Sequence, residues 1–349
     1  MLLKGGEDLE ALEVRGNTPL LGQHRMPPAR AFTAARLRVS PPAVLAAARA
    51  LVPQLTDGLR HKGAHGKVLI VGGSLEYTGA PFYAGMSALR TGADLVWVCC
   101  SEACATPLKA QSPELMVLPL IPADTAGTAA ALAALGPVLQ RVHALVLGPG
   151  LGRSEAALAF AAEVIRAAAR RDPPLPTVID ADGLYLLSLR PELLAGHPVV
   201  LLTPNAVELE RLTGKMLVPG CIILRKDAID CVLLSEADAV SEALPVLATV
   251  EGAGSPRRCG GQGDLLAGAA GTFLAWAVEA AAGEGVPLEG GRVVAAAVGA
   301  SALVRTAASI AFGELRRGTL TPDILRALPE AFEHCMEEEE EEEEGGGGE

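Results

Sequence analysis

The sequence predicts an α/β fold in which a mostly parallel central sheet carries helices on both faces. Short apolar runs alternate along the chain with alanine- and leucine-rich stretches of helical length. The apolar runs end in glycine or polar residues, which is typical of buried parallel strands joined by crossover helices. Hydrophobic residues make up 50% of the 349 residues but aromatic residues only 3%, a balance that favours close-packed helices and strands over an aromatic-rich β-sandwich.

The expected elements follow in chain order. A helix over 41–55 begins at Pro41 and Pro42, which suit a first helical turn. Strands are expected at 68–71, 94–100, 115–120, 144–147, 177–179, 199–202, 221–224, 231–234 and 246–250. Helices are expected at 79–91, 126–140, 154–171, 183–189, 207–212, 265–283, 291–311 and 322–334.

The pattern predicts one domain over residues 41–335, preceded by a leader at 1–40. From Val14 to Thr56 the chain carries arginines and no acidic residue, as a mitochondrial transit peptide does, although an unstructured leader without an address fits as well. We therefore expect a mitochondrial or cytoplasmic location. Residues 336–349 are mostly glutamate and glycine and predict a disordered acidic tail.

Charge and cysteine content exclude several classes of protein. The net charge is −12, but the tail contributes nine negative charges, so the rest of the chain is nearly neutral. The sequence shows no basic stripe for nucleic acid. The seven cysteines fit neither a zinc site nor a disulfide framework and indicate reduced thiols. We expect no membrane span, because the long apolar helix after Asp264 follows a loop too polar to flank a membrane.

A glycine-rich loop, GSPRRCGGQGD over residues 254–264, leads directly into that apolar helix. Backbone N–H groups and the positive end of a helix converge there, which makes a seat for an anion. Asp264 falls in the first helical turn beside this seat. The structural alternative is a tight loop in which Asp264 only caps the helix.

Polar and glycine residues also follow the other predicted strands, at the edge where an open α/β sheet binds its ligands. They are Gly72-Gly73-Ser74, the GPGLG run 148–152, Asp180-Ala181-Asp182, Thr203-Pro204-Asn205 and Lys226. Together they predict a cleft for a phosphorylated or nucleotide-sized ligand. No GxxxxGK[ST] motif occurs, and GPGLG is not the GxGxxG fingerprint, so neither a P-loop NTPase nor a dinucleotide-binding Rossmann unit is indicated.

The order GPGLG, VIDADGL, LLTPN and GSPRRCGGQGD resembles the NAD(P)H-hydrate dehydratases of the ribokinase-like superfamily. HKGAHGKVLIVGGSLEYTGAP and SALRTGADLVWV resemble the opening units of that family, and the similarity covers Leu45 to Asp323. SPRRCGGQGDLL is similar to the eukaryotic branch, which uses ATP. The resemblance implies a repair enzyme with a ribokinase-like fold that dehydrates hydrated NADH and NADPH with ATP and Mg²⁺.

The resemblance also implies roles for particular residues. The ring hydroxyl of the substrate would be phosphorylated and phosphate then lost, with Asp264 as general base and its pKa raised beside phosphate. Residues implied for the hydrated cofactor are Gly150, Asn205, Ala206, Val207, Glu208, Leu209, Glu210, Arg211 and Asp264. Residues implied for ATP are Lys226, Asp227, Ala228, Ile229, Asp230, Gly254, Ser255, Pro256, Arg257, Arg258, Cys259, Gly260, Gly261, Gln262 and Gly263.

Three departures from the family pattern lie on the nucleotide side. Asp227 stands where the family has glycine, which places a carboxylate near the phosphates. The chain is short by about one helix between Asn205 and Cys221, and the stretch 232–249 is unlike the usual short hairpin. Two alternatives therefore stay open: a small-molecule hydroxyl kinase of the same superfamily, and a nucleotide-binding pseudoenzyme.

Overall fold

The computed structural model describes residues 37–55, 61–213, 219–235, 244–286 and 288–336. The expected leader lies outside this part of the chain up to residue 36, and the expected acidic tail lies outside it from residue 337. Both expectations therefore stay predictions.

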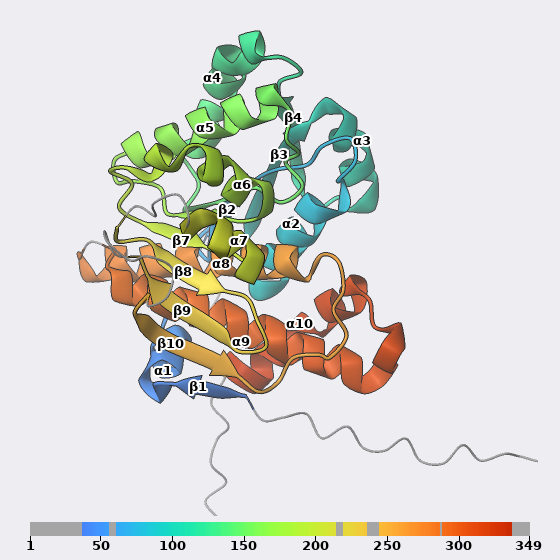
Figure 1. Cartoon of the computed structure of the whole chain (residues 1–349), viewed down its shortest axis with the longest axis vertical. Helices are drawn as coiled ribbons and strands as arrows, with labels where there is room; N and C mark the ends of the chain where they lie inside the picture. The colour runs from blue at the N-terminus through green and yellow to red at the C-terminus, as the bar shows by residue number, and fades with distance from the viewer. Residues whose placement is uncertain (1–36, 56–60, 214–218, 236–243, 287, 337–349) are drawn as a thin grey trace, which may run out of the picture. The chain divides into compact units, whose positions relative to one another are not determined.

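The described residues build a ten-stranded sheet around which the helices are arranged. Its strands are β1 (Arg38–Ser40), β2 (Lys67–Val71), β3 (Leu95–Ser101), β4 (Met116–Ile121), β5 (Ala144–Leu147), β6 (Thr177–Ile179), β7 (Val200–Leu202), β8 (Ile222–Arg225), β9 (Asp230–Leu234) and β10 (Val246–Glu251). They lie in the order β1-β10-β9-β8-β7-β6-β5-β2-β3-β4, which Figure 1 lets the reader follow from β1 to β4.

Strand direction divides this sheet into two parts. The strands from β8 through β4 pair in parallel, whereas β8, β9, β10 and β1 pair antiparallel. The chain runs outward from β2 through β3 and β4, and then returns to place β5 on the other side of β2. The order of the strands reverses between β2 and β5, and this switch point is where open α/β sheets bind ligands.

Helices cover both faces of the sheet. They are α1 (Pro42–Ala50), α2 (Gly79–Thr91), α3 (Glu102–Gln111), α4 (Thr128–Leu139), α5 (Glu155–Arg170), α6 (Ala181–Leu189), α7 (Ala206–Thr213), α8 (Gln262–Glu284), α9 (Gly290–Leu315) and α10 (Thr321–Met336). The first face packs against α1, α2, α3, α8, α9 and α10. The second packs against α4, α5, α6 and α7.

The apolar runs of the sequence are explained by this double cover. In β2, Val68 and Ile70 are buried in the first core, while Leu69 and Val71 are buried in the second. Small residues let α8 approach closely, since a Cβ on Gly268 would lie 2.0 Å from the carbonyl oxygen of Ala84 in α2. Any larger residue at 268 would therefore push α8 away from α2 and disturb the loop that leads into α8.

The predicted α/β class and the order of strands and helices are confirmed, with three differences. Residues Arg38–Ser40 were assigned to the leader, but their backbone pairs with β10, so the folded domain begins before residue 41. No helix was expected where α3 lies, because Pro107 falls inside it and its apolar periodicity is weak. The antiparallel direction of β9 and β10 was likewise not predicted.

Two helices of the described chain, α8 and the stretch Gly290–Gly318 that contains α9, are long and apolar enough by length and composition to cross a membrane. The sequence had pointed only to the first of them. Most residues of both are buried inside the protein, packed against each other and against the sheet. Their apolar character is thus accounted for by the core.

Candidate active site

The loops after β2 and β5 interlock at the switch point. The amide of Gly73 donates to the carbonyl oxygen of Gly150 at 3.1 Å, and the amide of Gly148 donates to that of Val71 at 2.9 Å. Asp182, after β6, accepts from the amide of Gly152 at 3.0 Å. Gly150, which the sequence assigned to the hydrated cofactor, therefore lies in a loop that backbone hydrogen bonds hold in place.

An ion pair joins the ends of β6 and β8, the two strands on either side of β7. Lys226, directly after β8, donates from Nζ to Oδ1 of Asp180, directly after β6, at 2.7 Å. The Asp180 carboxylate is 2% exposed. Burial alone would lower the pKa of Lys226, but the charges of Asp180, Glu208 and Asp264 outweigh it, so the pKa of Lys226 is raised. The ammonium therefore stays charged at this edge of the sheet.

The start of α8 meets this ion pair from the side. Gly261 precedes the helix with φ +99°, a backbone conformation that favours glycine. The Cα of Gly263 faces the pair so closely that a Cβ there would lie 3.3 Å from Nζ of Lys226. Asp264 follows in the first turn, where the helix end favours an anion. The two strand ends and the helix start thus converge on one point.

Asp264 is the carboxylate whose titration this arrangement changes most. Burial raises the pKa of Asp264 to about 7, the charge of Asp180 adds to the rise, and Lys226 opposes it. The sequence predicted the direction, but burial and a second carboxylate supply the cause rather than a bound phosphate. Tyr83 of α2 lies beside Gly261, where a Cβ would lie 2.9 Å from its ring, and burial and then the charge of Asp264 raise the pKa of Tyr83. A carboxylate with such a pKa suits proton transfer near neutral pH.

The first turn of α7 borders the cluster. Asn205 and Glu208 cap the helix reciprocally: the Glu208 amide donates to Oδ1 of Asn205, and the Asn205 amide donates to Oε2 of Glu208, both at 2.9 Å. Asn205 also bridges to Lys226 through the backbone. Ala206 and Val207 are exposed in this turn.

The rest of that predicted segment lies farther along α7. Leu209 packs against the second core. Glu210 and Arg211 are exposed beyond the first turn of the helix. The structure therefore places residues 205–208 beside the cluster, and not the whole predicted segment.

The turn 226–230, predicted for ATP, joins β8 to β9. Lys226 reaches the central cluster, whereas Asp227, Ala228 and Ile229 are exposed. The Asp227 carboxylate accepts from the amide of Ala228 at 2.7 Å. Asp230 is 5% exposed. The exposed part of this turn thus presents a carboxylate, a small side chain and the apolar side chain of Ile229.

The loop from Gly254 to Gly263 is tied to the chain before α10. Cys259 donates from Sγ to the carbonyl oxygen of Thr319 at 3.1 Å, and Thr321 donates from Oγ1 to that of Gly260 at 2.5 Å. The remaining members of the loop line its outer part or its entry into α8: Ser255 accepts from the Arg257 amide, Pro256, Arg257 and Arg258 are exposed, and Gln262 accepts from the Cys259 amide. The loop therefore reaches the cluster at its glycine-rich end.

Three residues at or beside the site were missed in the sequence. Asp180 was noted as a residue after a strand, but its partner Lys226 lies 46 positions away, and no local pattern links them. Tyr83 and Arg305 lie in the middle of helices, in α2 and α9. Their positions toward the site depend on helix packing, which the sequence pattern does not give.

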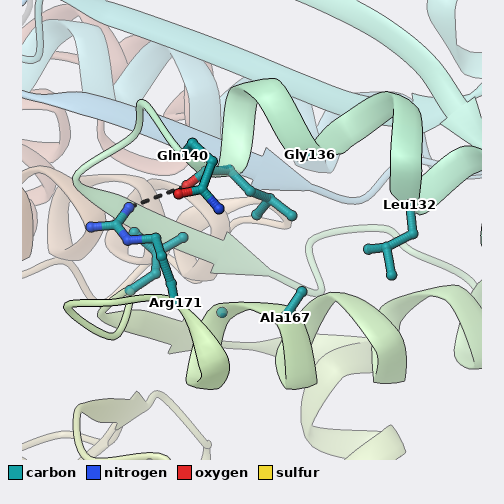
Figure 2. A pocket seen from close by; sticks show the side chains of 8 residues that line it. Leu132, Gly136, Gln140, Ala167 and Arg171 are labelled. Atoms are coloured by element: carbon teal, nitrogen blue, oxygen red, sulfur yellow. Dashed lines mark hydrogen bonds between the residues drawn. The ribbon is translucent and has the colours of Figure 1, made fainter.

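A separate apolar pocket lies between α4 and α5, as Figure 2 shows. Its lining comes from the ends of these helices that lead into β5 and β6, so it lies at the edge of the sheet opposite to the cluster. Arg171 at its rim donates to the carbonyl oxygens of Leu139 and Val142 at 3.2 and 2.6 Å. The guanidinium is thus used to close the end of α4, and the pocket carries none of the predicted site residues.

The residues present fit a magnesium ion that arrives with phosphate. Within the described ranges, no group of three or more His, Cys, Asp or Glu side chains is placed to hold a metal ion. Mg²⁺ commonly binds through one or two carboxylates together with substrate phosphates. Asp180 and Glu208, which both act on Lys226 electrostatically, supply carboxylates of that number beside the anion seat.

Comparison with known proteins gives one consistent family. A family model described as NAD(P)H-hydrate dehydratase matches residues 68–330. The chain is 37% identical over 302 residues to the ATP-dependent (S)-NAD(P)H-hydrate dehydratase of Drosophila melanogaster, covering 84% of this chain and 93% of the relative. It is 40% identical over 307 residues to the protein of the same name from Bos taurus, covering 84% and 89%.

Solved structures agree on the fold. A ribokinase-like superfamily protein from Enterococcus faecalis superposes with a TM-score of 0.62 at 20% identity, covering 84% of this chain and 95% of that one. The ADP/ATP-dependent NAD(P)H-hydrate dehydratase of Bacillus subtilis, co-crystallized with ATP/Mg²⁺, superposes with a TM-score of 0.54 at 20% identity, covering 82% and 96%.

Proposed function

The chain belongs to the NAD(P)H-hydrate dehydratase family, and we propose that the cluster around Asp264 is the site of its reaction. It is an ATP-dependent hydro-lyase that returns hydrated NADH and NADPH to the reduced cofactors. The names of its relatives favour this activity over the kinase and pseudoenzyme alternatives. One observation carries the assignment of the site: Asp264 stands at the positive end of α8, beside the ion pair of Lys226 with the buried Asp180, and has a pKa of about 7.

The chemistry begins with activation of a poor leaving group. Hydroxide leaves a carbon slowly, whereas phosphate leaves readily. Asp264 removes the proton of the ring hydroxyl. At the same time the hydroxyl oxygen forms a bond to the terminal phosphorus of ATP, and the bond between that phosphorus and the oxygen that leaves with ADP breaks. A base with a pKa near 7 is substantially ionised at neutral pH and still accepts a proton well.

Charge on the transferred phosphoryl group meets fixed positive groups. The raised pKa of Lys226 keeps its ammonium charged next to Asp264. The backbone N–H groups at the start of α8 point toward the same space and add the partial positive charge of the helix end. Such groups stabilise a phosphoryl transfer because they are already in place when the charge develops.

The second half of the reaction restores the ring. The bond between the ring carbon and the phosphorylated oxygen breaks, and its electron pair leaves with phosphate. A proton leaves the neighbouring ring carbon, the double bond of the reduced nicotinamide forms, and the departing phosphate takes up that proton. The elements of water are removed in total, with the oxygen carried away in phosphate.

Magnesium belongs to this proposal together with ATP. Asp180 and Glu208 are the residues that would hold it, directly or through water, beside the phosphates. Bound there, Mg²⁺ would neutralise phosphate charge.

The hydrated cofactor and ATP would bind to different segments around the cluster. Gly150 and the first turn of α7 would contact the hydrated cofactor, and the turn 226–230 and the loop 254–263 would contact ATP. Both assignments rest on the family resemblance and on the position of these segments around the cluster.

Purified protein tested with ATP, Mg²⁺ and hydrated NADH decides the proposal. Absorbance of the restored reduced ring should rise with time in the wild type and fail to rise with Asp264→Asn. Folded wild-type protein that restores no NADH overturns the proposed function. A stable phosphoester that accumulates without NADH would point to the kinase alternative instead.

A mitochondrial or cytoplasmic location is also part of the proposal, based on the stretch from Val14 to Thr56, which carries arginines and no acidic residue. Cell fractionation tests it, and recovery of the protein in mitochondria requires the leader to act as an address. Recovery in the cytosol alone removes the transit-peptide interpretation.

A further inference from the structure

Arg305 in α9 joins two separate loops on the nucleotide side of the cluster. Its guanidinium donates to the carbonyl oxygens of Ala228 at 2.6 Å and Asp227 at 3.3 Å in the turn between β8 and β9. From Nε and Nη2 it also donates to the carbonyl oxygen of Gly252, in the loop after β10, each at 3.2 Å. The carbonyl oxygen of Arg305 in turn accepts from the amide of Gly254 at 2.8 Å. One residue therefore connects both segments that the sequence assigned to ATP.

A buried carboxylate holds this guanidinium in place. Oδ1 of Asp230 lies 3.3 Å from Nη1 of Arg305 and also accepts from the amide of Asp227 at 2.9 Å. Its other oxygen accepts from Oγ of Ser301 at 2.7 Å. Asp230 is only 5% exposed, so its carboxylate serves contacts inside the protein. Ser301 and Arg305 are four residues apart on α9, and this spacing puts both side chains on the same face of the helix.

The shape of the guanidinium suits this position. It offers five donors in a rigid plane, and here they reach two loops and one carboxylate at the same time. A lysine would keep the positive charge but could not serve both loops with one compact ammonium. Figure 1 shows α9 running beside β8, β9 and β10, from where it can reach both loops.

Fixed loops matter for nucleotide binding because backbone groups of these two segments would face the phosphates. Loops that already have their bound geometry bind more tightly, since less conformational freedom is lost. The Asp227 side chain faces solvent, while its backbone N–H and C=O both belong to the network. The network thus fixes the main chain of the turn and leaves its outer side accessible.

We propose that Arg305 is a positioning residue for ATP: held by Asp230 and Ser301, it fixes the turn 226–230 against the loop 252–254 in the arrangement that binds the nucleotide. The family resemblance implied Asp230 as a contact of ATP, but its buried carboxylate contacts Arg305, Ser301 and the Asp227 amide, so in this proposal Asp230 acts through Arg305. This inference rests on the proposed function, in which ATP is the phosphoryl donor.

The test uses the full chain with Arg305→Lys and Asp230→Asn, and Arg292→Lys as the matched control. Arg292 lies on the same helix and pairs with Glu284, outside both loops. Binding of a fluorescent ADP analogue is titrated without the hydrated cofactor, and KM is measured separately for ATP and for hydrated NADH. We expect the first two variants to weaken analogue binding and raise KM for ATP by about tenfold, the effect of losing one or two hydrogen bonds. KM for hydrated NADH should stay within about twofold in all three.

The outcomes are separable from those of the proposed function. Unchanged nucleotide affinity in a folded Arg305→Lys protein overturns the inference, and so does an equal loss of affinity for both substrates, which would indicate a purely structural residue. Circular dichroism and thermal unfolding establish that each variant is folded. A wild type that binds the ADP analogue but restores no NADH would defeat the proposed function, while the nucleotide titration would still decide the role of Arg305.

Discussion

The proposed substrate side and the proposed nucleotide side of the Asp264 cluster are held together in different ways. On the substrate side, the loops after the parallel strands β2 and β5 are joined by backbone hydrogen bonds, such as the one from Gly73 to Gly150. On the nucleotide side, the loops of the antiparallel strands β8 to β10 are joined by the side chains of Arg305, Asp230 and Ser301. The substrate side therefore depends on where the backbone can go, and the nucleotide side depends on a few side chains.

This difference indicates where each side is vulnerable. Backbone pairing tolerates many side chains but few changes at its tight glycine positions. A side-chain network loses its hold with a single substitution, because the remaining buried groups are left without partners. The two sides meet at Asp264, Asp180 and Lys226, where chemistry requires both substrates to be in place.

Asp264→Asn should have the largest effect on activity, because it removes the base at the meeting point of the two sides. Loss of a positioned general base commonly lowers the rate by about 10²–10⁴-fold, and we expect kcat for NADH recovery to fall within that range. Affinity for an ADP analogue should stay within about threefold, because the amide is nearly isosteric. A variant that keeps more than a tenth of wild-type kcat would show that another group removes the proton.

Asp180→Asn should have the next largest effect and should also change the pH dependence. Wild-type activity should rise with pH up to about 7, where Asp264 becomes ionised, and then level off. Without Asp180 the repulsion that adds to the raised pKa of Asp264 disappears, so only burial still raises that pKa while Lys226 continues to lower it. The pH profile of kcat/KM should therefore shift toward acid, and the plateau should fall by about 10–100-fold as Lys226 loses its anchor.

The matched control for this change is Asp182→Asn, two residues away on the substrate side. Asp182 holds the amide of Gly152 and pairs with Arg153 at 2.9 Å, so its loss should raise KM for hydrated NADH and leave the pH profile in place. If both variants shift the profile equally, the effect of Asp180 on Asp264 is not specific.

The fold class could be predicted correctly because each buried strand carries its own signal. The run Val68 to Val71 is apolar throughout since both faces of β2 are covered, and the glycines that follow it mark the end of the strand. The order of these local signals also reproduced a family pattern, which led to Asp264 and the glycine-rich loop. Local signals of this kind can be read without knowing the tertiary structure.

The parts that could not be predicted depend on contacts distant in the sequence. The Lys226–Asp180 pair joins residues 46 positions apart, and the contact from Arg305 to Ala228 joins residues 77 apart. Arg305 follows Leu303 and Val304 in a long apolar helix, a position that indicates nothing about its partners. The cause of the raised pKa of Asp264 was missed for the same reason, because only folding buries Asp264 and brings Asp180 near it.

The pH dependence of thermal unfolding should show a smaller but distinct effect of the burial of Asp264. The pKa of Asp264 is raised from 3.8 to about 7 on folding, so the folded state holds this proton more tightly than the unfolded state. The stability that comes from the protonated carboxyl is complete below about pH 4 and is lost as pH rises through about 7. Asp264→Asn cannot ionise and should therefore unfold several degrees higher than the wild type at pH 8, with little difference at pH 4. Equal unfolding temperatures at both pH values would mean that Asp264 is not desolvated.

Asp227→Gly should have the smallest effect, although the resemblance made Asp227 the most suspect residue of the nucleotide side. The backbone at position 227 does not require glycine, because Asp227 is not among the described non-glycine residues with positive φ, which are Ala181, Ala253 and Arg316. The Asp227 side chain is exposed, and its carboxylate accepts from the amide of Ala228, while the backbone carries the contacts to Asp230 and Arg305. Replacing an exposed side chain of this kind should change KM for ATP by about twofold at most.

The comparison with Asp230→Asn, three residues along the same turn, makes this small effect informative. If side chains inside the network hold the nucleotide side, the buried Asp230 should matter about tenfold for ATP and the exposed Asp227 hardly at all. KM for ATP measured at several salt concentrations separates the two explanations, because repulsion between an exposed carboxylate and phosphates is screened by salt. If Asp227→Gly lowers KM for ATP tenfold or more at low salt and this improvement disappears at high salt, the Asp227 carboxylate lies against the phosphates. Charge, rather than loop geometry, would then be the property that limits ATP binding on the nucleotide side.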